Sequence, residues 1–366
     1  MNKKELYLKA KKAYYLGEPI LSDTEFDYLE NELKESGQLK DIQQVGFHDE
    51  NRNAKFKHPT RMLSLSKFQA DGNDNPCFIE VNKWLSKRSQ SKIYEATPKF
   101  DGNAVNIIYR NGKLDAILSR GDGDAGRDYT EKLINNVPNK IKTKHKIVEV
   151  RGEVVIPIDK FNQYNEKYDN EYKNERNFVA GILNRDVDET GIISEFVFMA
   201  VEAKAIENSE VVYLPTEILS KFGFNHKYSL YTIYFQKNEF IETYQKMLHH
   251  RKVDCPFRLD GFVIKTDINT RRELGENDHD PEWAVAIKFP PEEAVTKVID
   301  IEWNFGKTGN LTPVAILEPT LLDGTTVQRA SVHNLGWLIE KDCLPGTTVT
   351  IAKKGDIIPQ IINILK

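Results

Sequence analysis

The sequence predicts an α+β protein with a helical amino-terminal segment, a core of antiparallel sheets with helices, and a small carboxy-terminal β-barrel. Apolar residues recur at helical spacing in the first fifty residues, and they alternate with a period of two from about residue 94. Beyond residue 295, short strands are separated by glycine turns, a pattern typical of small barrels. We place the domain boundaries at residues 1–58, 59–292 and 293–366.

The amino-terminal segment predicts two helices. Residues 3–15 are rich in lysine, leucine and alanine, which are good helix formers, and Gly17 and Pro19 end this helix. Ser22 and Glu25 have the spacing of a capping box, so a second helix begins there. Residues 51–59 are polar and predict a linker.

The core begins with a predicted hairpin. Residues 104–109 and 114–119 form its strands, and Asn111-Gly112 is a strong signal for the turn between them. Further strands are expected at residues 147–156, 196–202, 259–265 and 283–289. Helices are expected near residues 216–222 and 239–250.

Composition limits the function classes. No run of about 18 apolar residues occurs, and residues 1–15 lack the apolar core of a signal peptide, so we expect a cytoplasmic protein without a membrane span. The three cysteines are widely spaced, which predicts neither a disulfide framework nor a CxxC metal site. A net charge of -4 argues mildly against a nucleic-acid partner.

Five short motifs follow one another in the core. Lys99-Phe100-Asp101-Gly102 comes first, and the others occupy residues 119–123, 150–153, 260–265 and 283–290. A single KxDG motif occurs by chance, but the ordered set is specific. It resembles the nucleotidyltransferase motifs of DNA ligases, and most closely those of the NAD-dependent DNA ligases. The resemblance covers nearly the whole chain.

The strand pattern suits a nucleotide site. A lysine amine is a nucleophile only when neutral, and nearby cations or desolvation lower its pKa. Lys265 and Lys288 can supply part of that cationic field and neutralise phosphate. Small residues flank Lys288 on one face of its strand, at Ala284 and Ala286. Gly261, Val263 and Lys265 share a face of the other strand, and the bulky face of the later strand carries Trp283, Val285, Ile287 and Phe289.

The resemblance implies roles for these residues. Lys99 would attack the adenylyl phosphorus of NAD⁺, release nicotinamide mononucleotide and form a lysine–AMP intermediate. AMP would pass to the 5′-phosphate of a DNA nick, where the 3′-hydroxyl would displace it. Arg120 would contact the nucleotide, Glu153 would bind ribose or metal, and Asp101 and Asp260 would support the lysine and a Mg²⁺ or Mn²⁺ ion. In a plainer interpretation, Glu153 only pairs with its neighbour Arg151.

The amino-terminal segment indicates the adenylyl donor. It resembles the family's small helical domain, which holds the nicotinamide mononucleotide half of NAD⁺ and which ATP-dependent ligases lack. The residues that carry this resemblance are Tyr14, Tyr15, Pro19, Asp23, Phe26 and Asp27. Aromatic rings can stack on nicotinamide, and carboxylates can meet its cationic ring or ribose hydroxyls. The tyrosine pair lies one residue closer to the proline than usual, and Phe26 replaces the usual tyrosine.

Four further core residues belong to the expected nucleotide and DNA contacts. Ser64 and Leu65 resemble the segment that links the family's helical domain to its core. Arg176 lies in a block whose arginine faces DNA or the nucleotide. Thr97 stands where the family usually has a glutamate that contacts adenine, and Glu95 cannot simply take its place. Recognition of adenine is therefore expected to be altered or to pass to backbone groups.

The carboxy-terminal region resembles the family's OB-fold, whose cationic groove can follow a nucleic-acid backbone. The matching blocks lie at residues 306–309, 312–315, 327–334 and 353–360. The expected DNA contacts are Lys307, Arg329, Lys353 and Lys354.

These features predict an NAD-dependent DNA ligase, or its adenylation subunit, that acts on nicked double-stranded DNA in replication and repair. The alternatives are an ATP-dependent or capping-like nucleotidyltransferase, and a decayed DNA- or NAD-binding module. Full-length relatives continue into zinc, helix-hairpin-helix and BRCT regions. We therefore expect a compact or split ligase of a bacterial cytosol or virus-infected cell, completed by a second polypeptide, or else a truncated chain.

Overall fold

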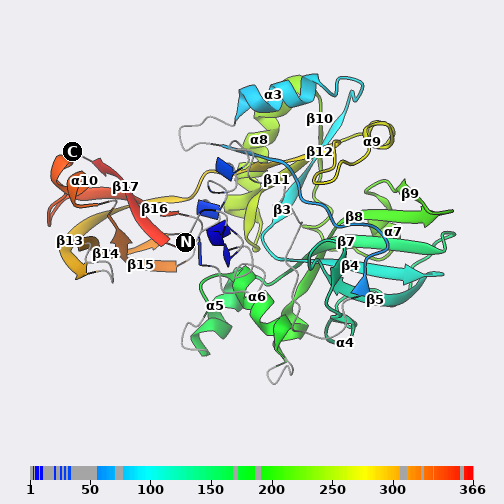
Figure 1. Ribbon diagram of the computed structural model, residues 1–366, viewed down its shortest axis with the longest axis horizontal. Coiled ribbons are helices and arrows are strands. Elements are labelled where there is room, and N and C mark those ends of the chain that lie inside the picture. Colours follow the sequence, from blue (N-terminus) through cyan, green and yellow to red (C-terminus); the bar gives the residue numbers. More distant parts are fainter. Residues whose placement is uncertain are drawn as a thin grey trace. The chain divides into compact units, whose positions relative to one another are not determined.

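The structure is a computed structural model, shown in Figure 1. It describes residues 56–70, 77–167, 172–185, 191–305, 311–322, 325–332, 334–354 and 358–365, together with scattered positions among the first 33 residues. The contacts divide the chain into two units. One contains residues 1–10, 19–39 and 290–366, and the other contains residues 11–18 and 40–289.

Most described residues between positions 3 and 33 are helical, as expected, whereas residues 20 and 21 form a bend. Tyr7 is buried and its ring stacks on Phe26, with ring centroids 5.0 Å apart, while Leu29 and Leu33 are also buried. Tyr14, Tyr15, Asp23 and Asp27 lie outside the described residues.

The first five-stranded sheet of the core has the order β10-β3-β11-β12-β2. Its strands are antiparallel except for β2, which runs parallel to β12. Their bounds are β2 Lys67–Gln69, β3 Tyr94–Phe100, β10 Ile233–Phe235, β11 Leu259–Thr266 and β12 Ala284–Lys288.

The second five-stranded sheet is antiparallel, with the order β5-β4-β7-β8-β9. The predicted hairpin is confirmed, because β4 and β5 pair across Asn111 and Gly112, both of which have positive φ as a tight primed turn requires. The strand bounds are β4 Asn103–Arg110, β5 Lys113–Ser119, β7 Ile147–Val155, β8 Val197–Glu207 and β9 Glu210–Tyr213. A short pair joins β1 Phe56–Lys57 to β6 Ala125–Gly126.

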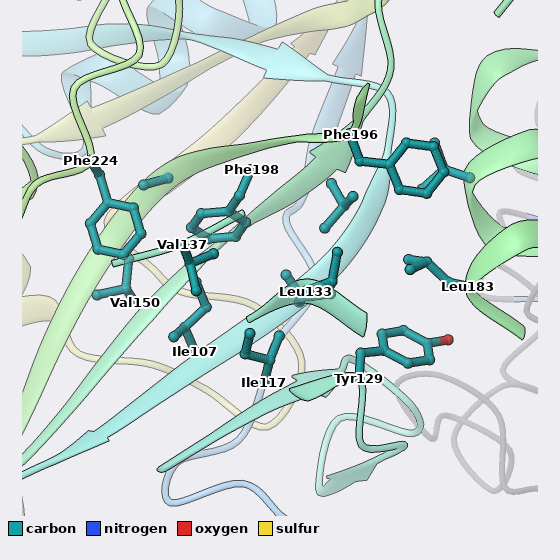
Figure 2. Packing of buried hydrophobic residues seen from close by; sticks show 14 of the residues in the cluster. Ile107, Ile117, Tyr129, Leu133, Val137, Val150, Leu183, Phe196, Phe198 and Phe224 are labelled. Atoms are coloured by element: carbon teal, nitrogen blue, oxygen red, sulfur yellow. The ribbon is translucent and has the colours of Figure 1, made fainter. Parts of the chain in front are cut away.

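Each sheet buries one face in a hydrophobic core of its own. The core of the second sheet includes residues of α4, α6 and α7, and Figure 2 shows its members Ile107, Val150, Phe198 and Phe224 packed together. The core of the first sheet includes residues of α3 and α8. The helix bounds are α3 Phe78–Ser86, α4 Thr130–Leu133, α5 Ile158–Lys167, α6 Glu175–Asn184, α7 Ile218–Lys221, α8 Phe240–His249 and α9 Ile268–Leu274.

The prediction that Trp283 shares a face with Val285 is wrong. Trp283 precedes β12 and packs with Tyr213, Val263 and Ala284, whereas Val285 lies in the core beneath the first sheet. The alternation of faces applies only within a strand, and this strand begins one residue later than expected.

The predicted barrel is confirmed. Five described strands close in the order β13-β14-β15-β17-β16, with β13 pairing to β16, around buried residues that include Val298, Leu317 and Ile351. The bounds are β13 Glu293–Phe305, β14 Leu311–Leu322, β15 Thr325–Ser331, β16 Thr348–Lys354 and β17 Ile358–Leu365, with α10 at Leu335–Glu340. Over the described part of the chain, no helix has the length and apolar character needed to span a membrane.

Candidate functional site

Lys99 and Lys288 share one carboxylate. Both pair in register with Gly261, one from β3 and the other from β12, so they lie on either side of β11. Lys99 Nζ donates a hydrogen bond to Asp260 Oδ2, and Lys288 Nζ lies 3.4 Å from Asp260 Oδ1. The Lys99 side chain is 26% exposed, so a ligand can reach its amine.

The carboxylate of Asp260 stays ionised. Burial would raise its pKa, but the charges of Lys99 and Lys288 outweigh burial and hold the pKa below its ordinary value. A register irregularity between Leu259 and Gly261 lies at this position of β11. Asp260 therefore orients both amines toward one place.

Gly261 leaves no room for a side chain. A Cβ built on it would lie 2.0 Å from the carbonyl oxygen of Ile287, so β12 and its Lys288 would have to move. We expect Gly261→Ala to lower the free energy of unfolding by about 1–3 kcal/mol, measured by urea denaturation.

Gly336→Ala is the matched control. The nearest atom to its added Cβ would be Asn334 Oδ1, at 3.2 Å, and the residue lies in the exposed helix α10. Its effect should stay within about 0.5 kcal/mol. Equal losses for the two variants would contradict the argument from close strand packing.

Asp101 and Arg176 lie beside the lysine pair. Arg176 Nη1 donates to Asp101 Oδ1 at 3.0 Å. Arg176 is held there by the start of α6, where the Asn174 side chain accepts from the backbone N–H of Asn177 at 2.8 Å. The expected DNA contact Arg176 is therefore placed next to Asp101 of the KxDG motif.

A buried ion pair that sequence analysis missed supports this helix start. Arg258 Nε donates to Glu175 Oε2 at 2.6 Å, and the carbonyl of Arg258 accepts from the backbone N–H of Asp101 at 3.0 Å. In the sequence, this pair is indicated only by the closeness of each residue to a motif position. The two residues themselves are 83 positions apart.

Glu153 on β7 lies close enough to Lys99, Asp101 and Arg176 for their charges to act on its carboxyl group. Burial raises its pKa to about 7, against the opposing charges of Arg176 and Lys99. The plainer pairing of Glu153 with Arg151 is not found, because Arg151 Nη2 instead donates to the carbonyl of Thr60 at 2.8 Å and lies 3.4 Å from Glu149 Oε2.

The segment before β2 connects both sheets to Arg120. Arg120 Nη2 donates to Ser64 Oγ at 2.8 Å, and the backbone N–H of Ser64 donates to the carbonyl of His279 at 3.1 Å. Leu65 packs against the cluster that contains Val263 and Trp283. Ser64, which we expected among the nucleotide contacts, therefore lies beside Arg120, while the neighbouring Leu65 faces the cluster of Val263 and Trp283.

A buried polar network anchors this segment to the second sheet. Asn106 Nδ2 donates to Glu149 Oε1 at 2.6 Å, and the hydroxyl of Thr60 donates to the other oxygen of Glu149. His58, whose pKa burial lowers, lies 3.2 Å from the carbonyl oxygen of Arg120. Sequence analysis missed this network. In the sequence, this network is indicated by Asn106, a polar residue inside an apolar strand.

Lys265 lies at the other end of the lysine-bearing face. It pairs in register with Glu95, four residues along β11 from Gly261, which corresponds to about 13 Å of strand. Its Nζ donates to the carbonyl of Val201 at 2.7 Å, and burial lowers its pKa to about 8.

Thr97 lies between these two ends. It is buried and pairs in register with Val263. Glu95 is engaged elsewhere, because it accepts from Thr216 Oγ1 at 2.9 Å and pairs with Arg271 at 2.8 Å. This agrees with the inference that Glu95 does not replace the carboxylate missing at Thr97.

The basic positions of the barrel differ in exposure. Arg329 is 54% exposed and pairs with Glu302 at 2.7 Å. Lys353 is only 7% exposed, which disfavours the expected DNA contact. Lys307 and the side chain of Lys354 lie outside the described residues.

The carboxylates near the lysine pair restrict where Mg²⁺ could bind. Among the described residues, no group of three or more His, Cys, Asp or Glu side chains could hold a metal. Both oxygens of Asp260 face lysine amines, which disfavours the expected metal contact there. Mg²⁺ commonly takes one or two carboxylates together with substrate phosphates, so a single carboxylate such as Glu153 would be enough to hold it.

Comparisons with known proteins find matches to both parts of the chain. The family model described as the NAD-dependent DNA ligase adenylation domain matches residues 50–292, and the NAD-dependent DNA ligase OB-fold domain matches residues 295–366. A DNA ligase of Bacillus velezensis is 36% identical over 96% of this chain and 54% of its own length. A DNA ligase of Herpetosiphon aurantiacus is 35% identical, over 98% of this chain and 56% of its own. The chain thus spans about half the length of the relatives it matches.

Proposed function

This chain belongs to the NAD-dependent DNA ligase family, and on that premise we propose that it transfers AMP from NAD⁺ to Lys99 as the first step in sealing DNA nicks. The observation that carries the proposal is the shared carboxylate. Lys99 and Lys288 both meet Asp260, with Arg176 and Asp101 beside them. A nucleophilic amine and a second cation thus converge where a phosphate can bind.

Four residues of the chain have distinct roles in this step. Asp260 orients Lys99, whose ammonium first loses a proton to solvent. The neutral amine then forms an N–P bond to the adenylyl phosphorus and releases a second proton to solvent, as the P–O bond to nicotinamide mononucleotide breaks. Lys288 stabilises the charge that develops on the phosphate oxygens. Glu153 binds a ribose hydroxyl or holds Mg²⁺, which would supply further charge neutralisation at the phosphates. The AMP then passes to a 5′-phosphate at the nick, and the 3′-hydroxyl displaces it.

The strand register sets the direction of the nucleotide. With its phosphate between Lys99 and Lys288, an adenosine that lies along β11 reaches Val263 and Lys265 with its base. Leu65 packs against the same cluster as Val263 and can form one wall for the ring. Lys265 therefore meets the base rather than the phosphate.

The test is covalent labelling. With Mg²⁺ and NAD⁺ labelled in its adenylate, the protein should form a stable protein–AMP adduct, whereas labelled ATP should form none. The reason is that the proposed amino-terminal contacts to nicotinamide mononucleotide have no counterpart in ATP. Preferential labelling by ATP would favour the alternative nucleotidyltransferase. DNA binding without any adduct would favour a decayed binding module.

Nicked double-stranded DNA is the proposed substrate of the later steps, with Arg329 and Lys307 of the barrel among its contacts. We also propose that a second polypeptide supplies the helix-hairpin-helix, zinc and BRCT functions. The check is nick sealing by this chain compared with a full-length relative at equal adduct levels. Equal rates would contradict the need for a partner.

A further inference from the structure

A β-bulge places two polar groups beside Lys265. In the pairing of β7 with β8, Arg151 lies opposite Glu202 and Gly152 lies opposite Ala200, so Val201 has no partner. Val201 turns its carbonyl to Lys265 Nζ, at 2.7 Å. Glu202 lies on the face of the sheet that carries Arg151, away from the core that contains Ala200 and Ala203.

Glu202 has an acceptor atom without a donor. Its Oε1 is buried and accepts no hydrogen bond from the described residues, and the nearest cation is Lys204 Nζ, at 3.5 Å. Lys204 is already engaged, because it donates to Glu276 Oε1 at 2.6 Å and lies 5.1 Å from the ring centroid of Tyr213. A buried acceptor of this kind destabilises the fold unless a ligand or an ordered water supplies the donor.

The carboxylate stays charged in this place. Burial would raise the pKa of Glu202, but Lys204, Arg151 and Lys265 outweigh burial and lower it. The neighbouring carboxylate, Glu95, is taken by Thr216 and Arg271. Glu202 is thus an ionised carboxylate with an oxygen that can accept a further hydrogen bond. Beside it, the ammonium of Lys265 has three N–H groups and donates one of them to the carbonyl of Val201.

We propose that Glu202 is a base-specificity residue, whose Oε1 accepts a hydrogen bond from the exocyclic amino group of adenine. The proposal rests on the function above, which places the base at Lys265. An adenine edge offers an amino donor next to a ring-nitrogen acceptor, and the acceptor of Glu202 and the donors of Lys265 complement that pair. A 6-oxopurine would instead turn a carbonyl oxygen toward the carboxylate, which repels it.

The experiment compares bases that differ only at this edge. Binding of AMP and of IMP, and adduct formation from NAD⁺ and from nicotinamide hypoxanthine dinucleotide, are measured for the wild type and Glu202→Gln. The wild type should prefer the adenine form at least about tenfold in Kd and in kcat/KM. The amide of Glu202→Gln can donate to a 6-oxo group, so its preference should fall to near one, mainly through tighter binding of the hypoxanthine forms.

Glu276→Gln is the matched control, because Glu276 contacts the same Lys204 but leaves the proposed acceptor intact. It should keep the wild-type preference. An equal loss of preference in Glu276→Gln, or an unchanged preference in Glu202→Gln, overturns the proposal. Binding of AMP and IMP tests base recognition by Glu202 independently of the proposed adenylyl transfer. A preference for AMP that Glu202→Gln loses, in a protein that forms no adduct, supports base recognition and refutes the ligase step.

Discussion

Replacing Lys99 with alanine is expected to abolish the protein–AMP adduct, with a loss of at least about 10⁴-fold in the rate of labelling by NAD⁺. In the proposed mechanism Lys99 supplies the nucleophile, and Lys288 lies on another strand, where it faces the second oxygen of Asp260. The measurement is single-turnover labelling followed by denaturing gel electrophoresis.

Two further variants separate chemistry from folding. Lys99→Arg keeps a cation for Asp260, but a guanidinium does not become neutral near pH 7, so the variant should fold with the wild-type Tm and form no adduct. Lys288→Ala keeps the nucleophile and should slow labelling about 10²–10³-fold. Adduct formation by Lys99→Ala at the wild-type rate would show that another residue is the nucleophile.

The pH dependence of stability should report Glu153. Its folded-state pKa is about 7, above the ordinary 4.5, because burial disfavours the charged form. Between these values the folded state holds a proton that the unfolded state has lost, so the stabilisation present below pH 4.5 is lost as the pH rises through 7. The free energy of unfolding should fall by up to about 3 kcal/mol from this group.

Glu153→Gln removes that titration. Relative to the wild type, the variant should gain up to about 3 kcal/mol between pH 5 and pH 8 in urea denaturation. Glu195→Gln is the control at a surface pair with Lys160, and its effect should stay below about 0.5 kcal/mol. A stability difference between Glu153→Gln and wild type that does not change with pH would contradict the shifted pKa.

Local patterns predicted most of the fold. Asn111-Gly112 specified a hairpin because both residues tolerate positive φ, and alternating residues located β4, β7, β11 and β12 within a few positions. Glycine-punctuated strands indicated the barrel. The error at Trp283 arose because alternation does not tell where a strand starts. Trp283 lies one residue before β12, so its side chain does not follow the alternation of that strand.

The ordered motifs also led to the chemistry proposed for the site. Through their resemblance to the NAD-dependent DNA ligases they indicated Lys99 as the candidate nucleophile, Lys288 as a cationic neighbour and Glu153 as a nearby carboxylate. They did not show that Asp260 serves both lysines, or that Lys265 lies about 13 Å along the strand from them.

The sequence by itself therefore determined the family, the types of element and the candidate reactive groups, since each of these is encoded within short stretches of chain. Only the tertiary structure decided which charges meet. The pairs Arg258–Glu175 and Arg176–Asp101 join residues more than seventy positions apart, and the bulge at Val201 turns Glu202 to its face. The reason is physical: strand register and long-range packing set side-chain direction, and a shift of one residue reverses it.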